Sequence, residues 1–129
     1  MKQTPLKRTK PMKRGKATAR SRLKKKKPAH GFPEEVRVAA RLRSDGICEA
    51  GSSVCNGKAV HFHHRKLRAH KDHTLVNCLH VCRGCHIFFH DQEPGTAYMM
   101  GWLVHSWQEP RDHLPMKGDR WNEHHRSQR

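Results

Sequence analysis

The cysteines of this chain are spaced as ligands of a single zinc ion. Cys82 and Cys85 are separated by two residues, which lets two thiolates reach one ion in a tetrahedral site. Cys48 and Cys55 supply a second pair, and because six residues separate them, the loop between them must bulge outward. We therefore predict a structural zinc site with four sulfur ligands and place Cys78 in the core. The alternative is that these thiols are buried as small apolar residues.

The histidines point to a second metal site with a catalytic role. Of the thirteen in the chain, His63 and His64 are adjacent, and His86 and His90 are four apart, so the latter two share a helical face. Adjacent side chains on an extended segment point opposite ways. We expect His63 to hold a cation with His86 and His90, and His64, with a pKa near 6.5, to take a proton from water. Competing ligands nearby are His61, His70, His73 and His80.

A helix is predicted ahead of the first cysteine pair. The fixed φ of Pro33 suits the first helical position, and Glu34 and Glu35 lie favourably against the positive end of the helix dipole. The run Ser44-Asp45-Gly46 is a stop signal. These signals predict a helix over residues 33–44.

Two short strands and a second helix are predicted to carry the histidines. Residues 58–62 and 79–81 have the composition of strands, and the charged segment 65–74 between them indicates a loop. A short helix is expected directly after the second strand. The apolar run 97–107 is expected to pack as a turn and a strand across the core.

In chain order, these residues resemble a known nuclease family. The order Cys48, Cys55, His63-His64-Arg65, Asn77, Cys82-x2-Cys85-His86-x3-His90 resembles the HNH endonucleases with a zinc-stapled ββα-metal (His-Me finger) core, over roughly residues 36–92. Trp102-Leu103-Val104 and Leu114-Pro115-Met116 are similar to the C-terminal extension of small free-standing phage HNH proteins. The resemblance implies an α+β fold: a ββα-metal core with a four-cysteine zinc site, preceded by a helix and a disordered basic tail.

The resemblance also implies a role for each signature residue. His64 matches the general base, and His63 matches a metal ligand that is Asp in many members. His86 matches the last signature histidine, a catalytic residue and metal ligand, and His90 matches an additional ligand of some members, including the colicin nucleases. Asn77 matches the middle signature residue, which orients the base without touching the metal. The implied cofactors are a structural Zn²⁺ and a catalytic divalent cation, Mg²⁺, Mn²⁺ or Zn²⁺.

The positive charge of the chain is concentrated at its beginning. Residues 1–33 carry 13 Lys or Arg and no Asp or Glu, whereas the formal net charge of the whole chain is +16. With little apolar material to bury, this segment is expected to be disordered when free. We therefore divide the chain into a disordered basic tail (1–32), an HNH nuclease domain (33–110) and a C-terminal extension (111–129).

A basic arm of this kind fits a polyanion, because each cation that neutralises a phosphate releases a counterion and adds affinity without reading bases. A simple solubility tail is the alternative. Within the domain, basic residues directly after the expected base could hold neighbouring phosphates, although a solvated basic loop explains them nearly as well. The expected DNA contacts are Arg65, Lys66, Arg68, Lys24, Lys25, Lys26 and Lys27.

The composition also limits where the protein works. No segment approaches the roughly 20 apolar residues that span a bilayer, and no apolar signal core follows Met1. We expect a soluble cytoplasmic protein with no membrane partner, in the host cytoplasm if it is phage-encoded. An odd cysteine number without a secretory signal favours metal ligands over disulfides.

The function expected from the sequence is metal-dependent hydrolysis of DNA phosphodiester bonds. By the phage resemblance, this would serve genome packaging or maturation beside terminase. A non-catalytic zinc-stapled nucleic-acid-binding module is the first alternative, and it needs the thiolates but has no use for His63, His64, Asn77 and His86 together. A basic RNA-binding or ribosome-associated zinc protein is the second. No helix offers convincing side chains for reading base edges, so low sequence selectivity is expected.

Overall fold

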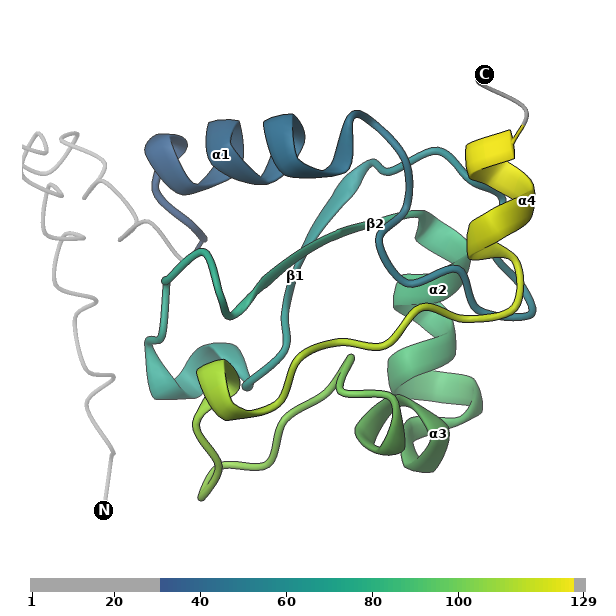
Figure 1. Ribbon diagram of the computed structural model, residues 1–129. Helices are drawn as coiled ribbons and strands as arrows, with labels where there is room; N and C mark the ends of the chain where they lie inside the picture. Colours follow the sequence, from purple (N-terminus) through teal and green to yellow (C-terminus); the bar gives the residue numbers. More distant parts are fainter. Residues whose placement is uncertain (1–30, 127–129) are drawn as a thin grey trace, which may run out of the picture.

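The structure is a computed structural model that describes residues 31–126 of the 129-residue chain. The described part is a small α+β structure in which a two-stranded sheet is surrounded by short helices (Figure 1). In chain order the elements are α1 (Glu34–Ser44), β1 (His61–His64), the 3₁₀ turn η2 (Arg68–His70), β2 (Cys78–Val81), α2 (Arg83–Ile87), the π-helical turn η3 (Phe88–Gln92), α3 (Pro94–Met99), the 3₁₀ turn η4 (Pro110–Asp112) and α4 (Trp121–Arg126).

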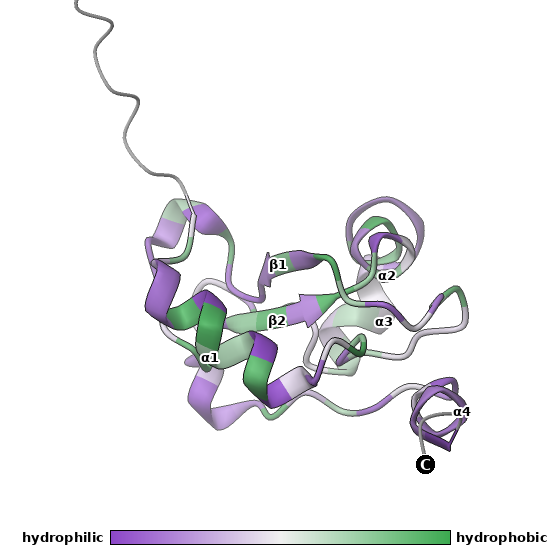
Figure 2. Cartoon of the chain, turned by 90° about the horizontal axis from the view of Figure 1, so that it is seen from above, coloured by the Kyte–Doolittle hydropathy of each residue, from purple (hydrophilic) through white to green (hydrophobic). Residues whose placement is uncertain are grey.

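Helix α1 forms where the sequence predicts it. Pro33 directly precedes its first residue, and Asp45 ends it in the left-handed conformation (φ 52°), donating its backbone N–H to the Arg41 carbonyl. Ala40 and Ser44 are the buried residues of the helix. Seen from above, α1 lies on one side of the β1–β2 hairpin, and α2 and α3 lie on the other (Figure 2). The hairpin is therefore the layer that both sets of helices share.

The sheet pairs β1 and β2 antiparallel, with His63 opposite Leu79 and His64 opposite Cys78. The second strand lies as predicted, but the first begins three residues later than expected, because Lys58 pairs with Ile47 in a separate bridge. The chain thus reaches the sheet only after it has closed the loop that carries the first two cysteines. His63 and His64 consequently lie within the strand, at its end.

The segment after β2 is more helical than the sequence predicts. Helix α2 follows the strand as expected and runs directly into η3. The apolar run 97–107 begins inside a helix, because Pro94 occupies the first turn of α3 and the Thr96 hydroxyl donates to the Glu93 carboxylate there. Trp102–Val104 is a buried bend, and only Val104 forms a β-bridge, in which its N–H donates to the Arg65 carbonyl. The expected turn and strand therefore shrink to this short stretch.

Two apolar clusters hold these elements together. The larger surrounds the four paired cysteines with Leu79, Val81, Phe89 and Trp102 among its members. The smaller joins Phe32, Ala40 and Cys78 between α1 and β2. Phe32 is 3% exposed. Phe32 therefore packs with the folded part, and the predicted domain boundaries stay a prediction.

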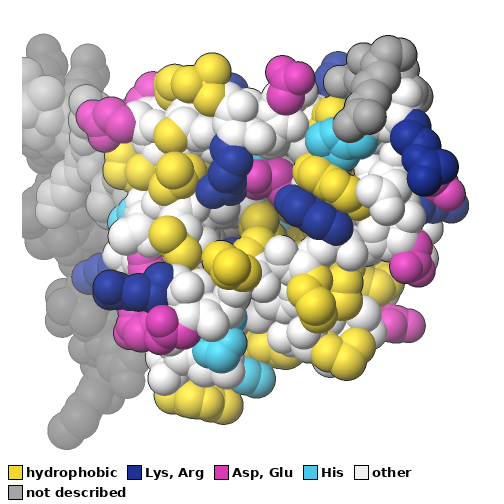
Figure 3. Space-filling view, in the orientation of Figure 1, with side chains coloured by type: hydrophobic (Ala, Val, Ile, Leu, Met, Phe, Trp, Pro, Cys, Tyr) yellow, Lys and Arg dark blue, Asp and Glu magenta, His cyan; other side chains and the backbone are white. Residues whose placement is uncertain are grey.

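The surface of the described part carries both signs of charge. Figure 3 shows Lys and Arg side chains as separate spots among apolar, acidic and neutral ones on this face. Within residues 31–126, no helix combines the length and apolar character needed to cross a membrane. The predicted disordered tail up to residue 30, including Lys24–Lys27, lies outside the described residues.

Candidate functional site

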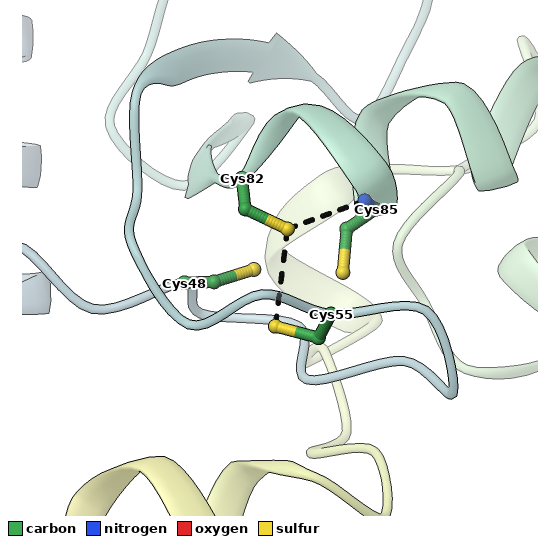
Figure 4. Close-up of side chains that lie close together, drawn as sticks. All are labelled: Cys48, Cys55, Cys82 and Cys85. Atoms are coloured by element: carbon green, nitrogen blue, oxygen red, sulfur yellow. Dashed lines mark hydrogen bonds between the residues drawn. The ribbon is translucent and has the colours of Figure 1, made fainter.

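Four cysteines converge on one point, as the sequence predicts. Cys48 and Cys55 come from the loop before β1, Cys82 caps the N-terminus of α2, and Cys85 lies in its first turn. Their sulfurs point toward one another (Figure 4) and lie within 4.8 Å of one another, all buried. The Sγ atoms of Cys55 and Cys82 are 3.8 Å apart, and two sulfurs on a tetrahedral zinc are also about 3.8 Å apart. The cluster could therefore hold a metal such as zinc.

Backbone N–H groups donate to two of the four sulfurs. The Cys85 backbone N–H donates to Cys82 Sγ at 3.3 Å, and the Gly57 N–H donates to Cys55 Sγ at 3.4 Å. Hydrogen bonds among the four thiols lower the pKa of Cys48 and Cys82 and raise the pKa of Cys55 and Cys85. Four cysteine sulfurs are a common ligand set of a structural zinc, so the residues fit this ion in type as well as in geometry. Cys78 lies apart from them in the smaller cluster.

The C-terminal extension packs on the wide loop between Cys48 and Cys55. Gly118 donates its N–H to the Ala50 carbonyl at 2.7 Å, and the Arg120 N–H donates to the Gly51 carbonyl at 3.1 Å. The Lys117 ammonium donates to the Glu49 carbonyl at 3.0 Å. These contacts explain how a six-residue gap can be held in a fixed shape, and nothing in the sequence around residue 118 signals them.

Three histidines form a second cluster of potential ligands. His63 comes from β1, His86 from α2 and His90 from η3, and one ring nitrogen of each lies within 4.8 Å of the others. His63 is buried, His86 is half-buried and His90 is exposed. The cluster therefore has a closed inner end and an open outer end. Three imidazoles that leave positions toward solvent fit a divalent cation with room for another ligand.

Trp102 positions His63 for such a role. The Nε2 atom of His63 lies 2.9 Å from the Trp102 carbonyl oxygen. A carbonyl only accepts, so Nε2 carries the hydrogen and the lone pair is left on Nδ1. Burial lowers the pKa of His63 to about 3, which keeps the ring neutral, as a ligand must be. Sequence reasoning missed this carbonyl, because a backbone acceptor 39 residues away has no signature.

His64 faces different surroundings from its neighbour. Its ring stacks on Phe32, with centroids 3.8 Å apart and planes 13° from parallel, and its Nε2 lies 3.1 Å from Nδ1 of His73. It is 8% exposed. Burial lowers its pKa to about 4, with smaller contributions from His73 and Arg68. The expected pKa near 6.5 is therefore corrected, although the ring is neutral at pH 7 either way.

Asn77 fixes the loop that follows β1. Its Oδ1 accepts the Lys66 backbone N–H at 2.6 Å, and its Nδ2 donates to the carbonyls of Lys66 and Asp72 at 3.2 and 2.8 Å. Its own carbonyl accepts the Arg65 N–H at 2.9 Å. Asn77 is thus fully engaged with backbone.

The expected phosphate contacts within the described part separate into two kinds. Arg68 is exposed and Lys66 is half-buried, so both can reach a solvent ligand. Arg65 is 1% exposed, and its guanidinium donates to backbone carbonyls of the interior. The guanidinium thus faces the interior rather than solvent, and the DNA contact of Arg65 stays a prediction that this geometry does not favour.

The remaining histidines near the site have other partners. His80 is buried, with its Nδ1 2.7 Å from the Ser44 hydroxyl, and His73 pairs with His64. His61 is exposed at the far end of β1, with its ring centroid 5.3 Å from that of His86. His61 therefore extends the row of rings without entering the close group of three.

Comparison of the chain with protein-family models, with curated protein sequences and with solved structures gives no match in any of the three. The class that the fold and the site define is a small α+β protein with a buried four-cysteine cluster that could bind a metal.

Proposed function

We propose that this protein is a metal-dependent endonuclease of the HNH type, with a ββα-metal core, that hydrolyses phosphodiester bonds in DNA. The observation that carries the proposal is the convergence of His63, His86 and His90. His63 directly precedes His64 in the chain, and His86 directly follows Cys85 of the buried four-cysteine cluster. The order of these residues resembles the family signature. The cysteine cluster would stabilise the fold, and the histidine cluster would bind the catalytic cation.

The histidine cluster would hold the catalytic divalent cation, Mg²⁺, Mn²⁺ or Zn²⁺. When bound, such an ion supplies polarisation of the phosphate and stabilisation of charge on the leaving 3′ oxygen. His63 contributes Nδ1, because Trp102 engages its other nitrogen. His90, the exposed member, marks the side from which a phosphate could approach.

His64 would remove a proton from the attacking water. A lone pair is available on its Nδ1 in the tautomer in which Nε2 donates to Nδ1 of His73. The stack on Phe32 holds the ring plane in one orientation. An approaching phosphate is negative and would raise the pKa of His64 from about 4 toward neutrality, which strengthens it as a base.

DNA would be held mainly by charge. Lys66 and Arg68 lie on the loop after β1, and Lys24–Lys27 belong to the basic segment that contains no acidic residue. The basic spots on the domain face in Figure 3 are separate from one another, so broad attraction falls to the tail. We propose low sequence selectivity for the same reason. A role beside terminase in phage genome packaging or maturation is proposed from the family resemblance alone.

Plasmid nicking tests the proposal. Zinc-loaded protein is incubated with supercoiled plasmid and Mg²⁺ or Mn²⁺, with and without chelator, and the relaxed form is quantified on a gel. We expect metal-dependent nicking that falls by at least about 100-fold in His64→Ala. His70→Ala is the matched control, because His70 is an exposed histidine of the same loop region, and it should nick like the wild type. Retained nicking by His64→Ala with unchanged zinc content would remove His64 from the mechanism.

One observation favours the non-catalytic nucleic-acid-binding alternative. His64 is only 8% exposed, and it lies between Phe32 and His73, so water has little access to it in this state. In that case, the histidines would be structural and the protein would bind DNA without cutting it. Binding to plasmid DNA without nicking under every metal condition above would establish this alternative.

A further inference from the structure

An exposed tryptophan caps a stack of three rings at the end of the apolar run. His105 lies between Tyr98 and Trp107, with centroid distances of 4.0 and 4.4 Å and each pair of planes only 5° from parallel. Tyr98 and His105 are partly buried, whereas Trp107 is 77% exposed. One ring face of the tryptophan is therefore covered by His105, and most of the rest is open to solvent.

The turn that presents Trp107 is closed at both ends. The Gln108 N–H donates to the His105 carbonyl at 3.0 Å, and the His105 N–H donates to the Gln108 side-chain oxygen at 3.1 Å. Ser106 and Trp107 form the tip between them. An exposed indole on a flexible loop would turn inward or lose its orientation, whereas these hydrogen bonds and the stack keep this ring outward.

The ring stack is joined to the histidine cluster through a short buried stretch. Val104, directly before His105, donates its N–H to the Arg65 carbonyl at 2.8 Å, and the Trp102 carbonyl accepts from His63. A pocket of about 540 Å³ runs beside the inner two rings, lined by Tyr98, His105 and Gln108 among others. His105 and Trp107 of the stack thus follow closely after Trp102, whose carbonyl positions a proposed metal ligand.

We propose that the outer face of Trp107 is a stacking platform for an unpaired nucleobase of DNA. The free face of the ring is flat and is bordered in the chain by the polar Ser106 and Gln108, so a planar base can stack on it as the next ring of the series. Every nucleobase has a π-face, so such a platform needs no sequence preference. The formal net charge of the chain is +16, with 13 basic residues in the segment 1–30, and it supplies general attraction to the phosphate backbone. The inference rests on the proposed function, which makes DNA the ligand.

Abasic DNA separates the contribution of base stacking to binding from that of the phosphate charge. Binding of the full-length, zinc-loaded protein is followed by fluorescence anisotropy, without added Mg²⁺ or Mn²⁺, for a labelled thymidine oligonucleotide and for an abasic oligonucleotide of the same length. Salt is set high enough to weaken phosphate contacts of the tail. We expect the wild type to prefer the base-bearing strand by about tenfold. Trp107→Ala should remove that preference, and Trp107→Phe should keep part of it.

Met99→Ala is the matched control, because Met99 is also a large exposed side chain, at 71%, on the neighbouring α3. It should bind both strands like the wild type. Equal affinity of the wild type for the two strands would overturn the inference, as would an unchanged preference for the base-bearing strand in Trp107→Ala. The inference would also fail if Trp107→Ala altered only the self-association of the protein, measured by analytical sedimentation. A base preference without any plasmid nicking would instead retain the platform and remove the nuclease.

Discussion

Arg65 carries a positive charge into the interior of the molecule. Its Nε donates to the Gly101 carbonyl at 2.8 Å, its Nη1 to those of Val76 and Pro110 at 3.0 and 3.1 Å, and its Nη2 to that of His113. Burial lowers its pKa to about 10, so it stays charged at neutral pH. One side chain therefore ties the end of β1 to segments far along the chain.

Replacing this guanidinium should unfold the protein more easily. Arg65→Met keeps much of the volume but leaves several buried carbonyls without a donor, so we expect the free energy of unfolding to fall by about 3 kcal/mol. Arg68→Met, at an exposed position outside this network, should change it by less than about 0.5 kcal/mol. Urea unfolding of the zinc-loaded proteins, followed by tryptophan fluorescence, measures both. Equal stability of Arg65→Met and the wild type would contradict this account.

The sequence distinguishes some of these residues and not others. Alternation along a strand predicted that His63 and His64 face different surroundings, and the cysteine spacing predicted the sulfur cluster, because both depend on local geometry. Arg65 and Arg68 have the same chemistry and similar neighbours in the chain. The carbonyls of residues 76, 101, 110 and 113 engage Arg65 and not Arg68, and most of those contacts are long-range.

At the scale of elements, those marked by local sequence signals were predicted and those that depend on distant contacts were not. Helix α1 and strand β2 were predicted to within about one residue, because Pro33 and Asp45 mark the helix and the strand is continuously buried. Helix α4 was not predicted. It is a short helix against which Lys117 packs, with its ammonium 3.8 Å from the Trp121 ring centroid, and local sequence says little about such tertiary support.

The contact between the C-terminal extension and the cysteine loop is tested by two glycine substitutions that should change the free energy of unfolding in opposite directions. A Cβ at Gly118 would lie 2.2 Å from the Gly51 carbonyl oxygen, whereas one at Gly95 meets nothing within 4 Å. Gly118→Ala should therefore lower the free energy of unfolding by about 2 kcal/mol and speed zinc release. Gly95→Ala, inside α3, should raise it by up to about 1 kcal/mol. Urea midpoints measure stability, and zinc transfer to a chromophoric chelator measures zinc release. Equal rates of zinc release in Gly118→Ala and the wild type would show that the contact of the C-terminal extension does not stabilise the cysteine loop.

At the scale of the whole molecule, the four-cysteine cluster occupies the centre of the larger core. Residues of β2, α2, η3 and α3 pack around it, while the aromatic content is only 6% of the chain. A structural zinc contributes on the order of 10 kcal/mol to folding. The fold should therefore depend on the metal more than on any single apolar contact.

Two cysteine variants separate metal binding from packing. Cys82→Ser removes one ligand, and we expect loss of bound zinc together with loss of the far-ultraviolet circular dichroism of the folded protein. Cys78→Ser alters a thiol that is equally buried but lies in the smaller cluster, so it should keep one zinc per chain. Metal content and X-ray absorption at the zinc edge are the measurements. A wild-type spectrum without zinc–sulfur scattering would remove the zinc assignment.

The basic residues that would attract DNA and the residues that could bind metal lie in different parts of the chain. Residues 1–30 hold 13 of the 27 Lys and Arg, and both ligand clusters lie outside this segment. For each phosphate that the protein no longer neutralises, the slope of log K against log salt for duplex DNA should flatten by about 0.9. We therefore expect deletion of residues 1–30 to lower both affinity and slope, and exchange of Lys24–Lys27 for Gln to give an intermediate slope. Filter binding over a salt series measures these slopes. Equal slopes of log K against log salt for all three proteins would show that the tail does not bind DNA.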